Sequence, residues 1–166
     1  MASAITNKKF VITETNQYGL GLFASHNIQK GTMLAIFNGE TYEAEQCSKL
    51  PNDPPRLIRD HAIQYAEHKW RDSKSAARLA NHSCEPNCGI KDLFTIVAMR
   101  DIKKGEEITW DYEMTEDSDW EMKCKCGSPV CRKIIRAYRY MPKSVKQKYR
   151  GYISGWLIEK YANEQE

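Results

Sequence analysis

The 166-residue sequence has no long hydrophobic run, and this absence limits the class of protein that it encodes. A helix that crosses a membrane needs about 20 consecutive apolar residues, and no apolar run here approaches that length. Residues 1–10 also lack the apolar core of a secretory signal peptide. We therefore expect a protein of the cytoplasm or nucleus, with no membrane association and no secretion by a signal peptide.

Internal repeats and low-complexity segments are absent as well, so the sequence does not indicate a repeat array or a long flexible linker. The length is typical of one domain, and a hydrophobic content of 41% is enough for a core. Six cysteines without a secretion signal are expected in a reducing compartment. In that setting we expect metal ligands or free thiols rather than a disulfide framework.

Charge of one sign is missing from each of two adjacent stretches. Residues 111–121 contain six acidic and no basic residues, whereas residues 122–158 contain ten basic and no acidic residues. The ordinary explanation of such stretches is a solvated surface. The functional alternatives are an acidic rim for a basic protein substrate and a basic face for nucleic acid or another anion.

Apolar patterns predict a chain built mainly from short strands. Strands are expected in four segments with apolar, β-branched or aromatic character, at 10–13, 32–37, 93–99 and 107–112. Residues 42–50 predict a short helix, and residues 76–80 also have helical character. Residues 56–72 suit either a helix or strands, and we interpret His61 and His68 there as structural or surface histidines.

The C-terminal part has a different pattern. From Lys143 onward, apolar residues recur every three or four positions, which predicts a helix with one apolar face. Gly151 and Gly155 each weaken such a helix by about 1 kcal/mol relative to alanine. We therefore expect a C-terminal helix that bends or breaks near these glycines.

The stretch from Asn81 to Cys88 is the one around which the rest of the chain is organised. It reads Asn-His-Ser-Cys-Glu-Pro-Asn-Cys, and its serine, proline and asparagines are turn formers, so we expect a loop. Amide, imidazole and thiol groups lie within a few residues of one another there. On its own the octapeptide could be an ordinary turn. Three other stretches, at 19–21, 105–112 and 124–131, favour a candidate site instead.

A second candidate site contains three thiols within eight residues, those of Cys124, Cys126 and Cys131. Gly127 and Pro129 allow the chain to fold back between them. A structural zinc ion takes four soft ligands in a tetrahedron, so one more distant thiol is needed. Cys84 and Cys88 are the two candidates, and either would tie the C-terminal region to the central loop.

Two further features are ambiguous from the residues alone. Gly19 and Gly21 flank Leu20, and such a pair either forms a tight turn or lets a ligand approach the backbone. Tyr112 ends a predicted strand, where a tyrosine is ordinarily a core residue. At a site, its hydroxyl can orient a reacting group.

Five motifs together resemble one family. They are Gly19-Leu-Gly-Leu-Phe-Ala24, Phe37-Asn-Gly-Glu40, Arg78-Leu-Ala-Asn-His-Ser-Cys-Glu-Pro-Asn87, Gly105-Glu-Glu-Ile-Thr-Trp-Asp-Tyr112 and the Cys124 cluster. In this order they resemble a SET-domain protein lysine methyltransferase with a post-SET zinc segment, over roughly residues 8–135. The resemblance implies a mainly β fold with some α, in which short β-sheets surround a loop threaded into a pseudoknot. It divides the chain into a SET domain (8–115), an acidic loop with the post-SET zinc segment (116–135) and a C-terminal helical extension (136–166).

The resemblance also implies a function and a set of site residues. The implied reaction moves a methyl group from S-adenosylmethionine to a lysine side chain of a protein, here a histone or another basic protein. The implied cofactor-binding residues are Gly19, Leu20, Gly21, Arg78, Asn81 and His82. Tyr112 is the implied catalytic residue, and Phe37 and Trp110 line the implied substrate channel. The implied ligands of one structural zinc ion are Cys84, Cys124, Cys126 and Cys131, which selects Cys84 over Cys88.

The sequence departs from the family pattern in four places. Residue 37 is Phe where Tyr is frequent, and residue 110 is Trp where Phe or Tyr is usual, so the number of methyl groups added is left open. The segment between Asp72 and Arg78 is shorter than usual. Lys133 stands where the family commonly has Gly.

A different class of function is a catalytically inactive, zinc-stabilised module that binds protein or nucleic acid, with the basic C-terminal region as its contact surface. Such a module would not need Asn81, His82 and Tyr112 together. Their presence favours the enzyme.

Overall fold

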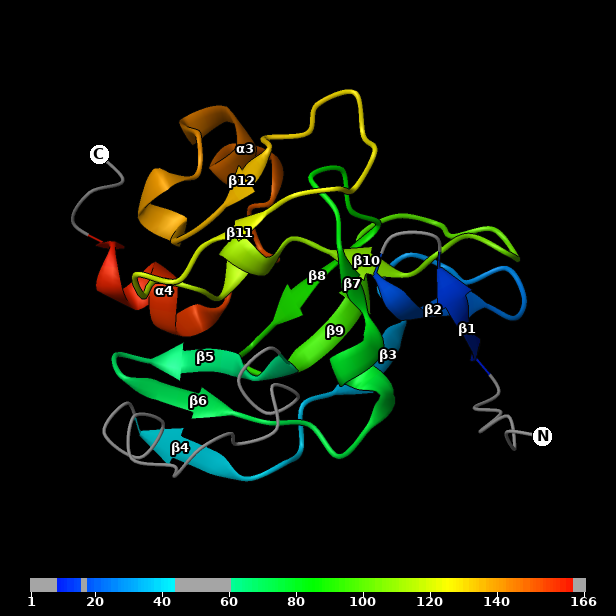
Figure 1. The fold of residues 1–166 in the computed structure, drawn as a ribbon, viewed down its shortest axis with the longest axis horizontal. Helices are drawn as coiled ribbons and strands as arrows, with labels where there is room; N and C mark the ends of the chain where they lie inside the picture. The colour runs from blue at the N-terminus through cyan, green and yellow to red at the C-terminus, as the bar shows by residue number, and fades with distance from the viewer. Residues whose placement is uncertain (1–8, 16–17, 44–60, 163–166) are drawn as a thin grey trace.

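The computed structural model describes residues 9–15, 18–43 and 61–162, and within them short strands form five small sheets (Figure 1). The strands are β1 (Phe10–Thr15), β2 (Gly19–Ala24), β3 (Met33–Ile36), β4 (Thr41–Glu43), β5 (Ile63–Ala66), β6 (Lys69–Arg71), β7 (Asn81–His82), β8 (Cys88–Lys91), β9 (Thr95–Ala98), β10 (Thr109–Trp110), β11 (Met122–Lys123) and β12 (Ile134–Ile135). The mainly β fold expected from the sequence is confirmed.

Most of the pairing is antiparallel. β1 and β2 form a hairpin, β9 lies between β3 and β8, β6 lies between β4 and β5, and β11 pairs with β12. The ambiguous segment before residue 72 therefore supplies strands. The helix expected at 42–50 is wrong at its start, because Tyr42 lies in β4. The rest of that segment lies outside the described residues.

One strand pair is parallel, and it fixes the position of the loop that begins at Asn81. β7 and β10 run parallel, with Asn81 opposite Thr109 and His82 opposite Trp110. The side chain of Asn87 strengthens this junction by accepting a hydrogen bond from Thr109 N (3.0 Å) and donating one to Glu107 O (2.7 Å). Residues far apart in sequence are thereby held in one fixed register.

Helices are short and lie at the edges of this β framework. They are η1 (Ala76–Leu79), η2 (Tyr112–Met114), η3 (Tyr138–Tyr140), α3 (Lys143–Lys148) and α4 (Gly155–Lys160). The expected C-terminal helix is two helices, because Gly151 between them has a φ of 83°, in the left-handed region that favours glycine. None of the helices in the described part of the chain combines the length and apolar composition needed to cross a membrane.

A continuous hydrophobic core joins the two ends of the described chain. Phe10 and Leu22 from the first hairpin, Ile96 from β9 and Leu157 from α4 are all buried in it. Tyr152 O also accepts a hydrogen bond from Ile90 N of β8 (2.8 Å). The C-terminal helices are therefore part of the same packed unit as the β framework.

Candidate functional site

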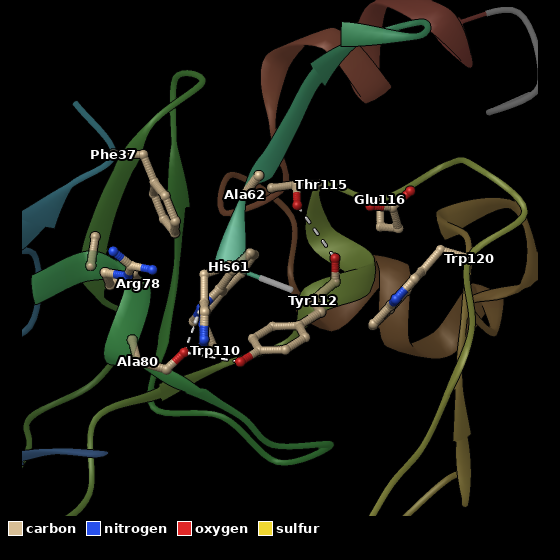
Figure 2. A pocket seen from close by; sticks show the side chains of 11 residues that line it. Phe37, His61, Ala62, Arg78, Ala80, Trp110, Tyr112, Thr115, Glu116 and Trp120 are labelled. Atoms are coloured by element: carbon tan, nitrogen blue, oxygen red, sulfur yellow. Dashed lines mark hydrogen bonds between the residues drawn. The ribbon is translucent and has the colours of Figure 1, made fainter. Parts of the chain in front are cut away.

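A small pocket of about 40 Å³ opens beside Tyr112 (Figure 2). Its lining comes from several elements and comprises Phe37, His61, Ala62, Ala77, Arg78, Ala80, Trp110, Tyr112, Thr115, Glu116 and Trp120. In Figure 2, Phe37 and Arg78 lie on one side of Tyr112, and Glu116 and Trp120 lie on the other. Three residues that the sequence analysis assigned to catalysis and the substrate channel therefore share one cavity.

The inner end of the pocket converges on one carbonyl oxygen. Ala80 O accepts a hydrogen bond from the Tyr112 hydroxyl (3.2 Å) and another from Trp110 Nε1 (3.2 Å). The two rings lie 4.9 Å apart, and the Phe37 ring packs edge-on against Trp110 at 6.0 Å. Burial raises the pKa of Tyr112 above its ordinary value, so its hydroxyl stays protonated and can donate a hydrogen bond.

The Gly19-Leu20-Gly21 segment packs directly against the neighbour of Ala80. Asn81 Nδ2 donates to Leu20 O (3.1 Å) and to Glu107 Oε1 (2.8 Å). A Cβ on Gly21 would lie 2.7 Å from Glu107 Oε1, so only glycine permits this approach. Gly19 has a φ of 77° and open space around it, which leaves its backbone accessible. The segment thus presents free backbone one residue away from the Tyr112 pocket.

His82 links the pocket to the cysteine cluster. Its Nδ1 accepts a hydrogen bond from Tyr112 N (3.2 Å), and its Nε2 lies 3.4 Å from Cys84 Sγ. Burial and the charge of Arg132 lower the pKa of His82 to about 3, so the ring is neutral. His82 also lines a groove of about 660 Å³ that includes Tyr18, whereas Arg78 faces the Tyr112 pocket. Of the six expected cofactor residues, Arg78 lines the Tyr112 pocket and His82 lines the groove, whereas Gly19, Leu20, Gly21 and Asn81 line neither cavity.

The cysteine cluster has the donor chemistry of a zinc site. Ligand atoms of His82, Cys84, Cys124 and Cys126 all lie within 4.8 Å of one another. The sulfurs of Cys84 and Cys124 are 3.8 Å apart, about the separation of two sulfurs bound tetrahedrally at 2.3 Å from one zinc ion. Cys88 is buried in β8, within the hydrophobic core. The set expected from the resemblance stays a prediction, with His82 as an additional donor.

The thiols differ in how readily they ionise. Burial alone would raise the pKa of Cys126, but hydrogen bonds from the Cys84 and Ser128 backbones and contacts with the Cys124 and Cys131 thiols bring it to about 7. Cys131 therefore also belongs to the cluster. A thiol that ionises near neutral pH is suited to metal binding, because the thiolate is the form that coordinates.

Arg132 neutralises two carboxylates behind His82. Its Nη2 lies 2.8 Å from both oxygens of Asp111 and 3.4 Å from Oε2 of Glu113. Burial raises the pKa of Asp111 to about 6, and burial with repulsion from Asp111 raises that of Glu113 to about 7. The acidic residues nearest Tyr112 are thus internal and do not form a solvated surface.

Further along, the acidic stretch is also partly internal. Asp117 is buried and accepts hydrogen bonds from Tyr161 and Arg139, whereas Asp119 is fully exposed and pairs with Arg139 (2.8 Å). A substrate rim that includes Asp117 is therefore wrong, because its charge is used within the fold. Glu116, which lines the pocket, is the acidic residue placed to meet a substrate.

Lys133 explains one departure from the family pattern. Its φ is 68°, in the left-handed region that favours glycine, which is the residue that the family commonly has there. A hydrogen bond of 2.7 Å from Cys124 N to Lys133 O holds this conformation.

Several site residues escaped the sequence analysis. The Tyr18 hydroxyl accepts a hydrogen bond from Lys125 N (2.7 Å) and ties the first hairpin to the cysteine segment. Trp120 and His61 line the pocket, and Ala80 contributes only its carbonyl oxygen. An isolated tryptophan within an acidic stretch was a usable signal for Trp120. A backbone acceptor has no side-chain signature at all.

Comparison with known proteins found a matching family model and several curated relatives. A family model described as SET domain matches residues 19–113. The histone-lysine N-methyltransferase, H3 lysine-36 specific, of Debaryomyces hansenii is 31% identical over 134 residues, covering 74% of this chain and 18% of that protein. The histone-lysine N-methyltransferase, H3 lysine-4 specific, of Schizosaccharomyces pombe is 34% identical over 129 residues, covering 68% of this chain and 14% of that protein.

A solved structure has the same fold. The crystal structure of KRYPTONITE in complex with mCHG DNA and SAH superposes with a TM-score of 0.57 at 22% identity, covering 74% of this chain and 28% of that one. The chain thus spans less than a fifth of the length of these two curated relatives.

Proposed function

The chain belongs to the SET-domain family, and from that premise we propose that it transfers a methyl group from S-adenosylmethionine to a lysine side chain of a protein, with histones as the favoured substrate class. The observation that carries the proposal is the meeting of the Tyr112 hydroxyl and Ala80 O at the inner end of an aromatic pocket. The names of the two histone methyltransferase relatives support the choice of histones. They specify different lysines, so the target lysine stays open.

The residues around β7 fit the methyl donor. Gly19 offers accessible backbone, and Asn81 and His82 follow directly after Ala80. These residues, with Gly21 and Arg78, would hold S-adenosylmethionine, which supplies an electrophilic methyl group on a sulfonium centre.

The pocket prepares the lysine as a nucleophile in two ways. Its walls of Phe37 and Trp110 are buried and apolar, which disfavours an ammonium and lowers the pKa of an entering lysine. The Tyr112 hydroxyl and Ala80 O then fix the direction of the amine lone pair. Because the amine and the methyl donor would then be held in a fixed orientation, the entropy cost of aligning them is met by binding and not in the reaction step. Both oxygens also stabilise positive charge on the transferring carbon.

The experiment that tests the function is methyl transfer from labelled S-adenosylmethionine to core histones and, in parallel, to ribosomal proteins. Incorporation into a histone band would support the proposal. Incorporation into ribosomal proteins alone would support the methyl-transfer reaction and would identify ribosomal proteins, in place of histones, as the substrate class. Absence of both transfer and calorimetric binding of S-adenosylmethionine would favour the inactive zinc-stabilised interaction module.

Trp110 is expected to limit the number of methyl groups added. Its indole ring is 5% exposed and fills the wall beside Tyr112. Trp110→Phe removes this volume, so we expect a several-fold rise in dimethylated over monomethylated product, since one methyl group changes pocket selectivity by about 10- to 200-fold. Mass spectrometry of a histone product measures the ratio. Trp70→Phe, in β6 and outside the pocket, is the control, and an unchanged ratio in Trp110→Phe would count against the idea.

We also propose that the basic C-terminal region contacts nucleic acid. Arg136, Lys143 and Lys148 are exposed, and the Arg136 guanidinium lies 5.0 Å from the centre of the exposed Tyr140 ring. Replacing all three by alanine should weaken binding to a labelled duplex and flatten its salt dependence by about three ion equivalents. Fluorescence anisotropy from low to physiological salt measures both the affinity for the duplex and its dependence on salt. Equal binding by the wild type and the triple variant would oppose it.

A histone substrate would also require a nuclear site of action. That location lies within the cytoplasmic or nuclear range expected from the sequence.

A further inference from the structure

The segment that follows Tyr112 is held by the C-terminal extension, defined here as residues 136–161. Four consecutive carbonyl oxygens, those of residues 114–117, each accept a hydrogen bond from the extension. The pairs are Ser154 N to Met114 O (2.9 Å), Trp156 Nε1 to Thr115 O (3.1 Å), Tyr138 N to Glu116 O (2.6 Å) and Arg139 Nη1 to Asp117 O (2.8 Å). The segment has little freedom to move unless the extension moves with it.

That segment is also one wall of the pocket. Thr115 and Glu116 line the cavity beside Tyr112, across from Phe37 and Arg78 (Figure 2). A substrate that enters the pocket therefore meets a wall whose backbone rests on the C-terminal extension.

Asp117 anchors this arrangement. Its side chain is fully buried, and Oδ2 accepts hydrogen bonds from the Tyr161 hydroxyl (2.7 Å) and Lys160 Nζ (2.9 Å). Its backbone N donates to Gln64 Oε1 in β5 (2.7 Å). A buried carboxylate is stable only with such partners, so the pocket wall, β5 and the end of α4 are joined at one charge.

We propose that Asp117 and Tyr161 are positioning residues for the protein substrate, acting through the Thr115–Glu116 wall. The proposal rests on the proposed methyl transfer. Neither residue touches the reacting atoms. Asn81 makes its hydrogen bonds to Leu20 and Glu107, so this part of the expected methyl-donor site does not depend on the anchor. Loss of the anchor should therefore weaken use of the protein substrate and leave donor binding unchanged.

The test is Tyr161→Phe in the full chain, which removes one hydroxyl and keeps the ring packed against Tyr138. We expect the KM for histone H3 to rise about tenfold, the lower end of the effect expected for one lost hydrogen bond to a charged group. The dissociation constant for S-adenosylmethionine should stay at the wild-type value. Amide hydrogen exchange at residues 114–118 should accelerate, and exchange in β8 and β9 should not.

Tyr152→Phe is the matched control, because the structure gives the Tyr152 hydroxyl no hydrogen bond within the described part of the chain. Asp117→Asn keeps an acceptor for Tyr161 but removes the charge that Lys160 and Arg139 face, so its KM should rise at least as much as that of Tyr161→Phe. A Tyr161→Phe variant with wild-type KM and wild-type exchange would overturn the inference. So would a parallel loss of donor affinity, which would indicate general destabilisation. A wild-type protein that transfers no methyl group would instead refute the proposed function. The hydrogen-exchange measurement would still test whether Asp117 and Tyr161 hold the segment at 114–118 in place.

Discussion

Tyr112→Phe is expected to reduce the rate of methyl transfer by about 100- to 1000-fold, which is the usual cost of removing one preorganised donor from a reaction centre. The hydroxyl meets Ala80 O at the inner end of the pocket, where the amine and the transferring methyl group would be aligned. Phenylalanine keeps the ring against Trp110 and His82, so the aromatic wall survives. The loss should therefore appear in kcat more than in the KM for histone.

Steady-state kinetics with labelled S-adenosylmethionine and histone H3 measures this effect. Calorimetry should give a donor dissociation constant within about twofold of wild type, and the free energy of unfolding should fall by only about 1 kcal/mol. Tyr152→Phe again serves as the control for loss of a tyrosine hydroxyl. A Tyr112→Phe enzyme with wild-type kcat would remove Tyr112 from the mechanism.

Loss of zinc is expected to have the second large effect. We propose that the purified protein carries one zinc ion per chain and that a strong chelator, or Cys124→Ser, abolishes methyl transfer. Cys124 lies between Cys84 and the Tyr18 hydroxyl, so its thiolate joins the central loop to the first hairpin. Structural zinc contributes folding free energy directly, on the order of 10 kcal/mol in small metal-folded domains. Without it, the segment from Cys124 to Cys131 would be held by hydrogen bonds such as those from Lys125 N to the Tyr18 hydroxyl and from Cys124 N to Lys133 O.

Metal analysis by mass spectrometry and thermal unfolding check this expectation. Cys88→Ala is the control, because Cys88 is buried in the core, and this variant should retain zinc. Comparing Cys131→Ser with His82→Ala identifies the fourth ligand, since only loss of a true ligand should lower zinc stoichiometry. A wild-type protein without zinc, or a Cys124→Ser variant that retains it, would refute the site.

The sequence motifs predicted which residues lie together at the pocket, whereas the contacts that hold them in place are known only from the structure. Phe37, Trp110 and Tyr112 are identifiable from short motifs, and they line one pocket. Their roles stay predictions, as do those of the cofactor and zinc residues. The motifs could predict these pocket residues because each motif is a local pattern that forms its own turn or strand.

The acidic stretch shows what could not be predicted. Its residues look alike in sequence, yet Asp111 is buried against Arg132, Asp117 against Tyr161, and Asp119 is exposed. Which carboxylate is buried depends on partners 20 to 44 positions away. Charge composition contains no information about such long-range pairing. The same limit applies to Ala80, where the chemistry belongs to the backbone.

The parallel register of β7 and β10 has a consequence for the growing chain on the ribosome. Asn81 and His82 emerge well before Thr109 and Trp110, and the carbonyl oxygens of residues 114–117 in the pocket wall accept hydrogen bonds from residues 138–156. Contacts of such long range form slowly and late, after most of the chain is available. A nascent chain that stops short of Ser154 would contain every strand of the fold but would leave the carbonyls of residues 114 and 115 without the partners that they have in the complete structure. The pocket wall therefore reaches its final arrangement only after the C-terminal extension has been synthesised.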